Sequence, residues 1–348
     1  MDSLPSLGGK PADDTIEAFT LANAHGFSAQ VINYGATVMS LRAPDRRGRL
    51  ADVVLGFDDP GRYLGPHPFF GAIAGRVAGR IGGARFVLDG RTYELAANDP
   101  PNHLHGGQVG FDRRFWSAAP VSHAGGAASV RLAYRSVDGE EGYPGTVDVT
   151  VTYTVTAGNA LVVDTEAATD RPTPFSVTQH SYFNLAGEGT IEGHRLQILA
   201  DSFAPADARM ALLGRREPVA GCGNDFTHPR RIGNAIGHLF QGHGDLYFLS
   251  PADGGAPRPA ARLFEPVSGR ILTVTTTEDC LQFYTGVSLD GSLSGKSGRP
   301  YVRHAGLCLE CESYPDAANT PALGDIILRP GHPKRQTTIY AFSTDADV

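Results

Sequence analysis

The chain has 348 residues and a formal net charge of −7, with 41% hydrophobic and 19% charged residues. This composition is typical of a globular protein with a substantial core, and it excludes a disordered chain. The acidic balance and the short, scattered groups of arginines argue against binding to nucleic acid or to anionic membranes.

Alternating strands dominate the predicted secondary structure, and helical periodicity is scarce. The clearest strand is VDVTVTYTV at 147–155, in which apolar side chains share one face and polar side chains share the other. This alternation is typical of a half-buried antiparallel strand. In chain order, strands are predicted at 15–23, 29–35, 36–44, 84–90, 91–97, 129–136, 147–155, 160–167, 194–200, 269–277, 281–287, 306–313 and 336–343.

Turn residues separate these strands. Asp89-Gly90 lies between FVL and RTYEL, which is a strong signal for a β-hairpin, and Gly158-Asn159 and Gly269 mark further turns. Glycine (43) and proline (24) are spread along the chain, with no linker and no repeat of fixed period. The pattern predicts one large antiparallel all-β domain covering residues 1–348.

The segment MDSLPSLGGKPADDTIEAF lacks the basic start and apolar run of a signal peptide, and no stretch is apolar enough to span a membrane. The expected compartment is the cytoplasm, where the four cysteines are not expected to form disulfides. Cys308 and Cys311 form a C-x-x-C within a predicted strand. Residues three apart in a strand point to opposite faces, which argues against a zinc or redox pair.

Long polar segments at 101–116, 136–145 and 289–306 interrupt the strands, and loops of this length in a compact domain tend to be functional. Several polar groups elsewhere in the chain and in these segments could carry chemistry. They are Arg76, Arg80, His103, His105, His180, Tyr182, Asp245, Gln282 and Glu310.

His180 and Glu310 each allow two interpretations. His180, in TQHSYFNL, is either a packed histidine with a hydrogen bond or an acid or base. Glu310 follows the uncharged run GLCL, where a carboxylate is expensive to bury without a partner. It is either paired with an arginine such as Arg303 or acts as a general base. Burial raises the pKa of a carboxyl group and a neighbouring arginine lowers it, so the pKa of Glu310 depends on its surroundings.

His103 and His105 fall on the same side of an extended NHLHGG, as a metal pair would. No third ligand follows, and the neighbouring glycines favour a histidine that contacts a ligand. The chain has no G-x-S-x-G elbow and no phosphate-binding glycine loop, so nucleophilic catalysis and nucleotide binding are not indicated. The remaining set of polar and aromatic side chains suits a polyhydroxylated ligand.

Seven motifs together resemble the aldose 1-epimerase (galactose mutarotase) family, in the family's order and over nearly the whole chain. They are NYGAT, FFGAIAGRVAGRIGGARF, NHLHGGQVGFDRRFW, DGEEGYPG, TQHSYFNLAGEG, QFYTGVSLDGS and GLCLECESYPDAANTP.

The resemblance implies a large antiparallel β-sandwich with an open sugar-binding cleft. It implies an enzyme that interconverts the α and β anomers of free aldoses such as glucose, galactose or xylose, with no cofactor and no metal. His180 would be the general acid and Glu310 the general base, and the nearby carboxylate is expected to keep His180 partly protonated. The implied sugar contacts are Arg80, His105, Tyr182, Asp245 and Gln282. The oligomeric state is expected to be a monomer or a homodimer.

Three positions depart from the family pattern. Gly79 stands where an asparagine is common, Leu246 where a histidine is common, and Cys311-Glu312 where Thr-Gln is common. Three other functions stay open: a non-catalytic sugar-binding β-sandwich, a hexose-6-phosphate 1-epimerase, and a glycoside hydrolase. The phosphate-specific enzyme would need a cluster of basic residues. The hydrolase would need two carboxylates, for which Glu310 and Asp245 are the candidates.

Overall fold

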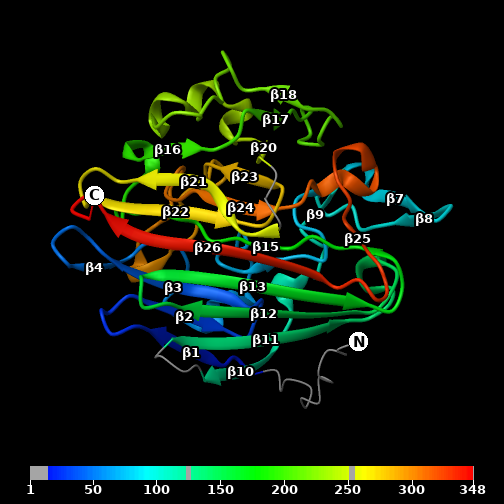
Figure 1. The fold of residues 1–348 in the computed structure, drawn as a ribbon, viewed down its shortest axis with the longest axis horizontal. Coiled ribbons are helices and arrows are strands. Elements are labelled where there is room, and N and C mark those ends of the chain that lie inside the picture. The colour runs from blue at the N-terminus through cyan, green and yellow to red at the C-terminus, as the bar shows by residue number, and fades with distance from the viewer. Residues whose placement is uncertain (1–14, 123–126, 251–254, 348) are drawn as a thin grey trace.

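A computed structural model describes residues 15–122, 127–250 and 255–347 (Figure 1). Most of the amino-terminal segment used above to argue against a signal peptide, residues 1–14, lies outside these ranges. Within them, no helix is long and apolar enough to cross a membrane.

The largest element is an antiparallel sheet of nine strands, which Figure 1 shows running across the molecule. Strands β11, β12 and β13 are neighbours both in the chain and in the sheet, as are β21 and β22, and the carboxy-terminal strand β26 lies between β13 and β22. In sheet order the strands are β10 (Ser117–Ser122), β11 (Ala128–Ser136), β12 (Val147–Val155), β13 (Ala160–Thr169), β26 (Lys334–Thr344), β22 (Arg270–Thr276), β21 (Arg258–Phe264), β16 (Arg195–Ile198) and β19 (Arg230–Arg231).

Two smaller sheets and four strand pairs complete the architecture. The four-stranded sheet holds β1 (Ala18–Ala22), β2 (Ser28–Ile32), β3 (Thr37–Pro44) and β4 (Leu50–Asp52). The five-stranded sheet holds β18 (Glu217–Pro218), β17 (Ser202–Ala204), β20 (Leu246–Phe248), β23 (Cys280–Tyr284) and β24 (Cys308–Glu312). The pairs are β14 (Thr173–Pro174) with β25 (Ile327–Leu328), β15 (Thr178–Gln179) with β5 (Ile73–Ala74), β6 (Arg80–Ile81) with β9 (His103–Leu104), and β7 (Arg85–Leu88) with β8 (Arg91–Glu94).

The helical segments of the described ranges are 3₁₀ turns of three to five residues, which connect the strands. They are η1 (Pro60–Leu64), η2 (Gly82–Ala84), η3 (Phe111–Arg113), η4 (Glu140–Gly142), η5 (Ile191–Gly193), η6 (Ile232–Asn234), η7 (Ile236–His238), η8 (Phe240–Gly242), η10 (Lys296–Gly298), η11 (Pro315–Ala318) and η12 (Pro321–Leu323).

The prediction of an antiparallel all-β sandwich is confirmed, and every predicted strand overlaps an observed one. Asp89 and Gly90, both with positive φ (49° and 78°), form the two-residue turn between β7 and β8. Such φ values match the primed turns that fit the twist of a hairpin. Strands β10 and β21 were missed because each contains a proline and few alternating apolar residues.

The main core lies between the nine-stranded sheet and the two smaller sheets. Leu309 and Cys311 of β24 pack into this core together with Leu272 and Val274 of β22. Because side chains alternate along a strand, the intervening residues of β24 point to the other face of the five-stranded sheet. That face is where the polar cavity lies.

Candidate active site

A polar cavity lies on the outer face of the five-stranded sheet, and loops from other parts of the chain complete its wall. It brings together every residue that the resemblance proposed for the site. These are Arg80, His105, His180, Tyr182, Asp245, Gln282 and Glu310.

His180 follows directly after the short strand β15, and its backbone is fixed on both sides. Its N–H donates to the carbonyl of Ala72 at 2.9 Å, and its carbonyl accepts from the N–H of Gly71 at 3.0 Å. The ring is buried against Phe69 and Tyr182, with centroid distances of 5.6 and 5.2 Å. The imidazole therefore has little freedom, and its two nitrogens are aimed by the backbone that carries it.

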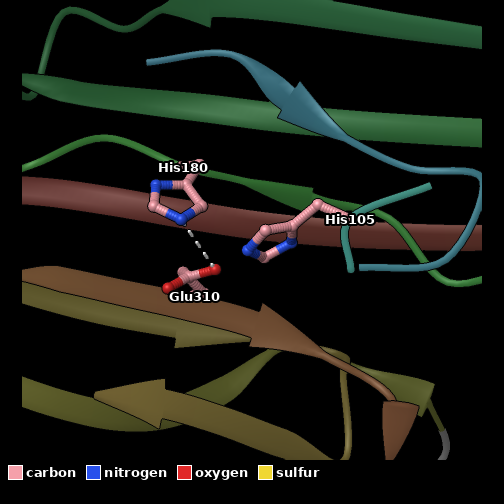
Figure 2. A group of neighbouring side chains, drawn as sticks. All are labelled: His105, His180 and Glu310. Atoms are coloured by element: carbon pink, nitrogen blue, oxygen red, sulfur yellow. Dashed lines mark ion pairs between the residues drawn. The ribbon is translucent and has the colours of Figure 1, made fainter. Parts of the chain in front are cut away.

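Glu310 extends from β24 toward this ring. Its Oε2 lies 3.4 Å from Nε2 of His180, and both side chains are buried (Figure 2). Among the described residues, His180 rather than Arg303 is the ion-pair partner of Glu310. The carboxyl group and the imidazole therefore form a close acid–base pair within the cavity.

The other nitrogen of the His180 ring faces a thiol. Sγ of Cys308 lies 3.6 Å from Nδ1, and burial raises the pKa of this thiol well above its usual value. A neutral thiol can donate to an unprotonated Nδ1 and accept from a protonated one. Nδ1 can therefore keep its proton in both charge states of the ring, with the thiol sulfur as acceptor, which leaves Nε2 as the nitrogen that exchanges protons with the cavity.

Burial sets the pKa values of the pair. It lowers the pKa of His180 to about 4. It raises the pKa of Glu310 to about 8, although the charge of Arg80 acts in the opposite direction. Burial thus favours the uncharged form of each group in the free protein, and the expectation that Glu310 helps to keep His180 partly protonated in the sugar complex stays a prediction.

The pair as a whole still carries one dissociable proton between these two pKa values. That proton can reside on Glu310, which gives two uncharged groups, or on His180, which gives an ion pair. Titrations of two groups this close belong to the pair rather than to either residue. Both forms hold the same number of protons, so passage from one to the other needs no exchange with solvent.

His105 approaches the pair from a different loop. Its backbone has a positive φ of 49°, and its Nδ1 accepts the N–H of Gly79 at 3.1 Å. The ring proton therefore resides on Nε2, which Figure 2 shows turned toward Glu310. Burial lowers the pKa of His105 well below its usual value, so the ring is a neutral donor.

The close grouping of His105, His180 and Glu310 has the composition of a metal site, with ligand atoms within 4.8 Å of one another. Binding through Nε2 of His105 would require that nitrogen to lose its proton while Nδ1 keeps accepting from Gly79. A metal ligand must be deprotonated at the coordinating atom. The donor set fits an acid–base site better than a metal site.

The remaining proposed sugar contacts are also held in place. Nε of Arg80 donates to Asp99 at 2.6 Å, and Nε2 of Gln282 donates to the carbonyl of Phe283 at 2.8 Å. Asp245 accepts a hydrogen bond from Asn224 at 3.1 Å, and burial raises its pKa to about 6.

Two candidates from the sequence lie outside the cavity. The buried guanidinium of Arg76 donates to the carbonyls of Pro144 and Gly145 and to the hydroxyl of Ser136. His103 contacts the carbonyl of Ala96 and the hydroxyl of Tyr143, each at 2.8 Å. The possible metal pair of His103 and His105 does not form, because both ring nitrogens of His103 have partners outside the cavity that His105 lines.

The sequence model of the family described as aldose 1-epimerase matches residues 17–341. The chain belongs to the aldose 1-epimerase family. The galactose mutarotase of Rattus norvegicus is 42% identical over 342 residues, covering 98% of this chain and 96% of the relative. The aldose 1-epimerase of Escherichia coli K12 is 34% identical over 350 residues, covering 98% and 99%.

Solved structures of family members share the fold. An aldose epimerase homologue from C. elegans superposes with a TM-score of 0.87 at 30% identity, covering 95% of this chain and 99% of that one. Galactose 1-epimerase from Lactobacillus acidophilus gives a TM-score of 0.83 at 28% identity, covering 97% of each chain. The fold is therefore that of the epimerase family.

This epimerase fold brings three more side chains to the cavity that sequence reasoning missed. Phe69 lies 4.7 Å from the His105 ring and 5.6 Å from the His180 ring, between centroids. His243 stacks near Tyr284 at 4.5 Å, and Glu312 lines the same wall as Glu310. Period-two alternation places Glu312 on the face of Glu310 and could have identified it, whereas no sequence pattern marks Phe69 or His243.

Proposed function

We propose that this protein is an aldose 1-epimerase that interconverts the α and β anomers of free aldoses such as glucose, galactose and xylose, with His180 as acid and Glu310 as base. The observation that carries this proposal is the buried pair, whose Nε2 and Oε2 lie 3.4 Å apart within a polar cavity. The ring oxygen and the anomeric hydroxyl are bonded to the same carbon, so two groups this close can address both.

Ring opening uses the ion-pair form. Protonated His180 donates from Nε2 to the ring oxygen while the Glu310 carboxylate takes the proton of the anomeric hydroxyl. The bond between C1 and the ring oxygen breaks, and the anomeric oxygen becomes the carbonyl oxygen of a free aldehyde. The pair is then uncharged, which is the form that burial favours.

Ring closure reverses the two roles. Rotation about the C1–C2 bond presents the other face of the aldehyde to the sugar hydroxyl that left. Neutral His180 takes the proton of this hydroxyl as it attacks C1, and Glu310 returns its proton to the carbonyl oxygen. The ion pair is restored, so the cycle consumes no external acid or base.

Other cavity groups support this chemistry. The charge of Arg80 lowers the pKa of Glu310, which stabilises the carboxylate required for ring opening. His105 offers a neutral N–H donor beside the pair, where oxygen gains negative charge as its proton leaves. Asp245 and Gln282 are positioned to bind the remaining hydroxyls, and Phe69 and Tyr182 supply apolar surface for the sugar ring.

The rival functions are less well supported. A hexose 6-phosphate needs several cations, and Arg80 is the one permanently charged cation among the described residues that line the cavity. Sugar binding alone gives no reason to bury a titratable pair at 3.4 Å.

Residues 1–348 would act as one catalytic domain in the cytoplasm, as a monomer or a homodimer.

Polarimetry on freshly dissolved α-glucose, α-galactose and α-xylose tests the proposed function. The protein should accelerate the approach to anomeric equilibrium above the buffer rate with at least one of these sugars, and the rates should rank them. Failure to accelerate any of the three, with sugar binding still detectable, would favour the binding-protein alternative.

The pH dependence of kcat/KM should be bell-shaped, with limbs near pH 4 and pH 8. Below about pH 4 both His180 and Glu310 are protonated and no base remains. Above about pH 8 both have lost their protons and no acid remains. Initial rates across pH 3.5–9, corrected for the buffer reaction, would measure the limbs. A single limb near pH 6.5 would indicate an unburied histidine and contradict this assignment.

A further inference from the structure

Glu312 is a second carboxyl group in the cavity, and the proposed mechanism does not use it. It lies two residues after Glu310 in β24, so both side chains emerge from the same face of the strand, about 6.6 Å apart along it. Both line the cavity. Glu312 is 1% exposed, so it is as buried as a core residue.

One oxygen of the Glu312 carboxyl lacks a hydrogen-bond partner, in contrast to the carboxyl groups of Glu278 and Asp245. Glu278 receives hydrogen bonds from Ser313 and Lys334, and Asp245 receives one from Asn224. Within the described ranges, no group lies in hydrogen-bonding range of Oε2 of Glu312. An unsatisfied buried polar group destabilises the fold, and it calls for an explanation such as a ligand.

The space in front of Glu312 is kept open by Gly79. A Cβ at this position would lie 3.2 Å from Oε1 of Glu312 and 2.4 Å from Cγ of Pro315. Gly79 also has a positive φ of 70°, which disfavours other residues. Two of the three departures from the family pattern thus lie side by side: the missing side chain at position 79 and the carboxyl at position 312.

The surrounding charges determine the form of this carboxyl. Burial raises the pKa of Glu312 well above its usual value, the charges of Glu310 and Glu278 add to this effect, and Arg80 opposes it. The titratable groups that face the cavity with it are Arg80, His105, His180, His243, Asp245 and Glu310. A protonated carboxyl both donates and accepts, as a sugar hydroxyl does.

Building on the proposed function, we propose that Glu312 contacts the substrate and determines sugar preference by binding a hydroxyl on the side of the ring away from the anomeric carbon. Glu310 must lie at the anomeric centre, and Glu312 lies one strand repeat farther along the same wall. That spacing suits a group on the opposite side of a pyranose ring. The sugar hydroxyl would supply the partner that Oε2 lacks in the protein.

Two substitutions test this contact: Glu312→Leu, which removes the polar group, and Glu312→Gln, which keeps a donor and an acceptor. Polarimetric kcat and KM are measured with glucose, galactose and their monodeoxy derivatives. Glu312→Leu should raise KM about 3- to 10-fold with little change in kcat, which corresponds to one lost hydrogen bond. Glu312→Gln should stay close to the parent. The deoxy sugar that lacks the contacted hydroxyl should bind equally to the parent and to Glu312→Leu.

Stability provides a readout that separates a contact from a structural role. Glu312→Leu removes a buried carboxyl group that has an unpaired oxygen. It should therefore raise the melting temperature and, at the same time, lower the affinity for the sugar. Glu265→Gln is the matched control: it alters a buried carboxyl that accepts backbone hydrogen bonds outside the cavity, so it should lower the melting temperature and leave sugar discrimination intact. Glu312→Met is a second apolar variant in case Glu312→Leu does not fold.

An unchanged KM and an unchanged order of deoxy sugars in folded Glu312→Leu would overturn the contact. This result would leave the epimerase proposal intact, provided that the parent accelerates mutarotation and that His180→Asn abolishes the acceleration. A parent protein that does not accelerate mutarotation would instead overturn the proposed function, and the contact with it.

Discussion

Replacing His180 by asparagine should lower kcat for mutarotation by about 10²- to 10⁴-fold. Asparagine can occupy the same buried position and donate a hydrogen bond, but it cannot gain and lose a proton near neutral pH. The ring oxygen then has no acid during opening, and the sugar hydroxyl has no base during closure. Polarimetry with the preferred aldose measures the loss.

His103→Asn is the matched control for this substitution. His103 is also fully buried, but its ring contacts Ala96 and Tyr143 rather than the cavity. This variant should lose stability and keep the kcat of the parent in its folded fraction. If His180→Asn retained more than about a tenth of the parental kcat, His180 would be a packed histidine and not the acid.

Replacing Glu310 by glutamine should reduce kcat by a similar factor, about 10²- to 10⁴-fold. Glutamine is nearly isosteric with the carboxyl and can still hydrogen-bond to His180, but it cannot accept the proton of the anomeric hydroxyl. Sugar binding should survive in part, because Arg80, Asp245 and Gln282 are unchanged. Equilibrium binding measured beside kcat separates the loss of chemistry from the loss of affinity.

The same substitution should change how stability depends on pH. The pKa of Glu310 rises from the usual 4.5 to about 8 in the folded protein, so between these values the folded state holds a proton that the unfolded state has lost. The contribution of Glu310 to the stability of the parent therefore falls as pH rises through this window. Glu310→Gln has no carboxyl group to lose this proton. The free energy of unfolding of the variant, relative to that of the parent, should therefore increase from pH 5 to pH 8.

Glu265→Gln is the matched control for stability. Glu265 is buried, and it accepts hydrogen bonds from the backbone of Val267 and Ser268 far from the cavity. Its pKa is lowered rather than raised, so neutralising it should destabilise the protein and leave kcat intact. A constant stability difference between Glu310→Gln and the parent across pH 5–8 would show that the Glu310 carboxyl is not protonated in the folded state.

The strands, and the two residues that we propose as the acid–base pair, could be predicted from the sequence. Alternation of apolar and polar side chains is a local property, so the strand at 147–155 could be predicted from that segment alone. Alternation also predicted that Cys308 and Cys311 diverge: Cys308 contacts His180, while Cys311 packs into the main core. The motifs around His180 and Glu310 resembled the family closely enough to assign both residues a role.

Other features depended on contacts between distant segments. Arg76 and Arg80 lie in one short motif, yet Arg76 binds core carbonyls and Arg80 lines the cavity. His105 lines the cavity, whereas His103 contacts Ala96 and Tyr143, and the sequence did not predict this difference. Phe69 and His243 reach the cavity on loops whose paths are set by tertiary packing.

Sequence and tertiary structure differ most in what they predict for the protonation of His180 and Glu310. The sequence by itself determined that a histidine and a glutamate are available, together with their ordinary pKa values, which predict a charged pair at neutral pH. Only the tertiary structure decided that the two lie 3.4 Å apart and are both fully buried, which reverses the preferred location of the proton. The physical reason is that a pKa depends on hydration and neighbouring charge, and both arise only when distant segments of the chain pack together.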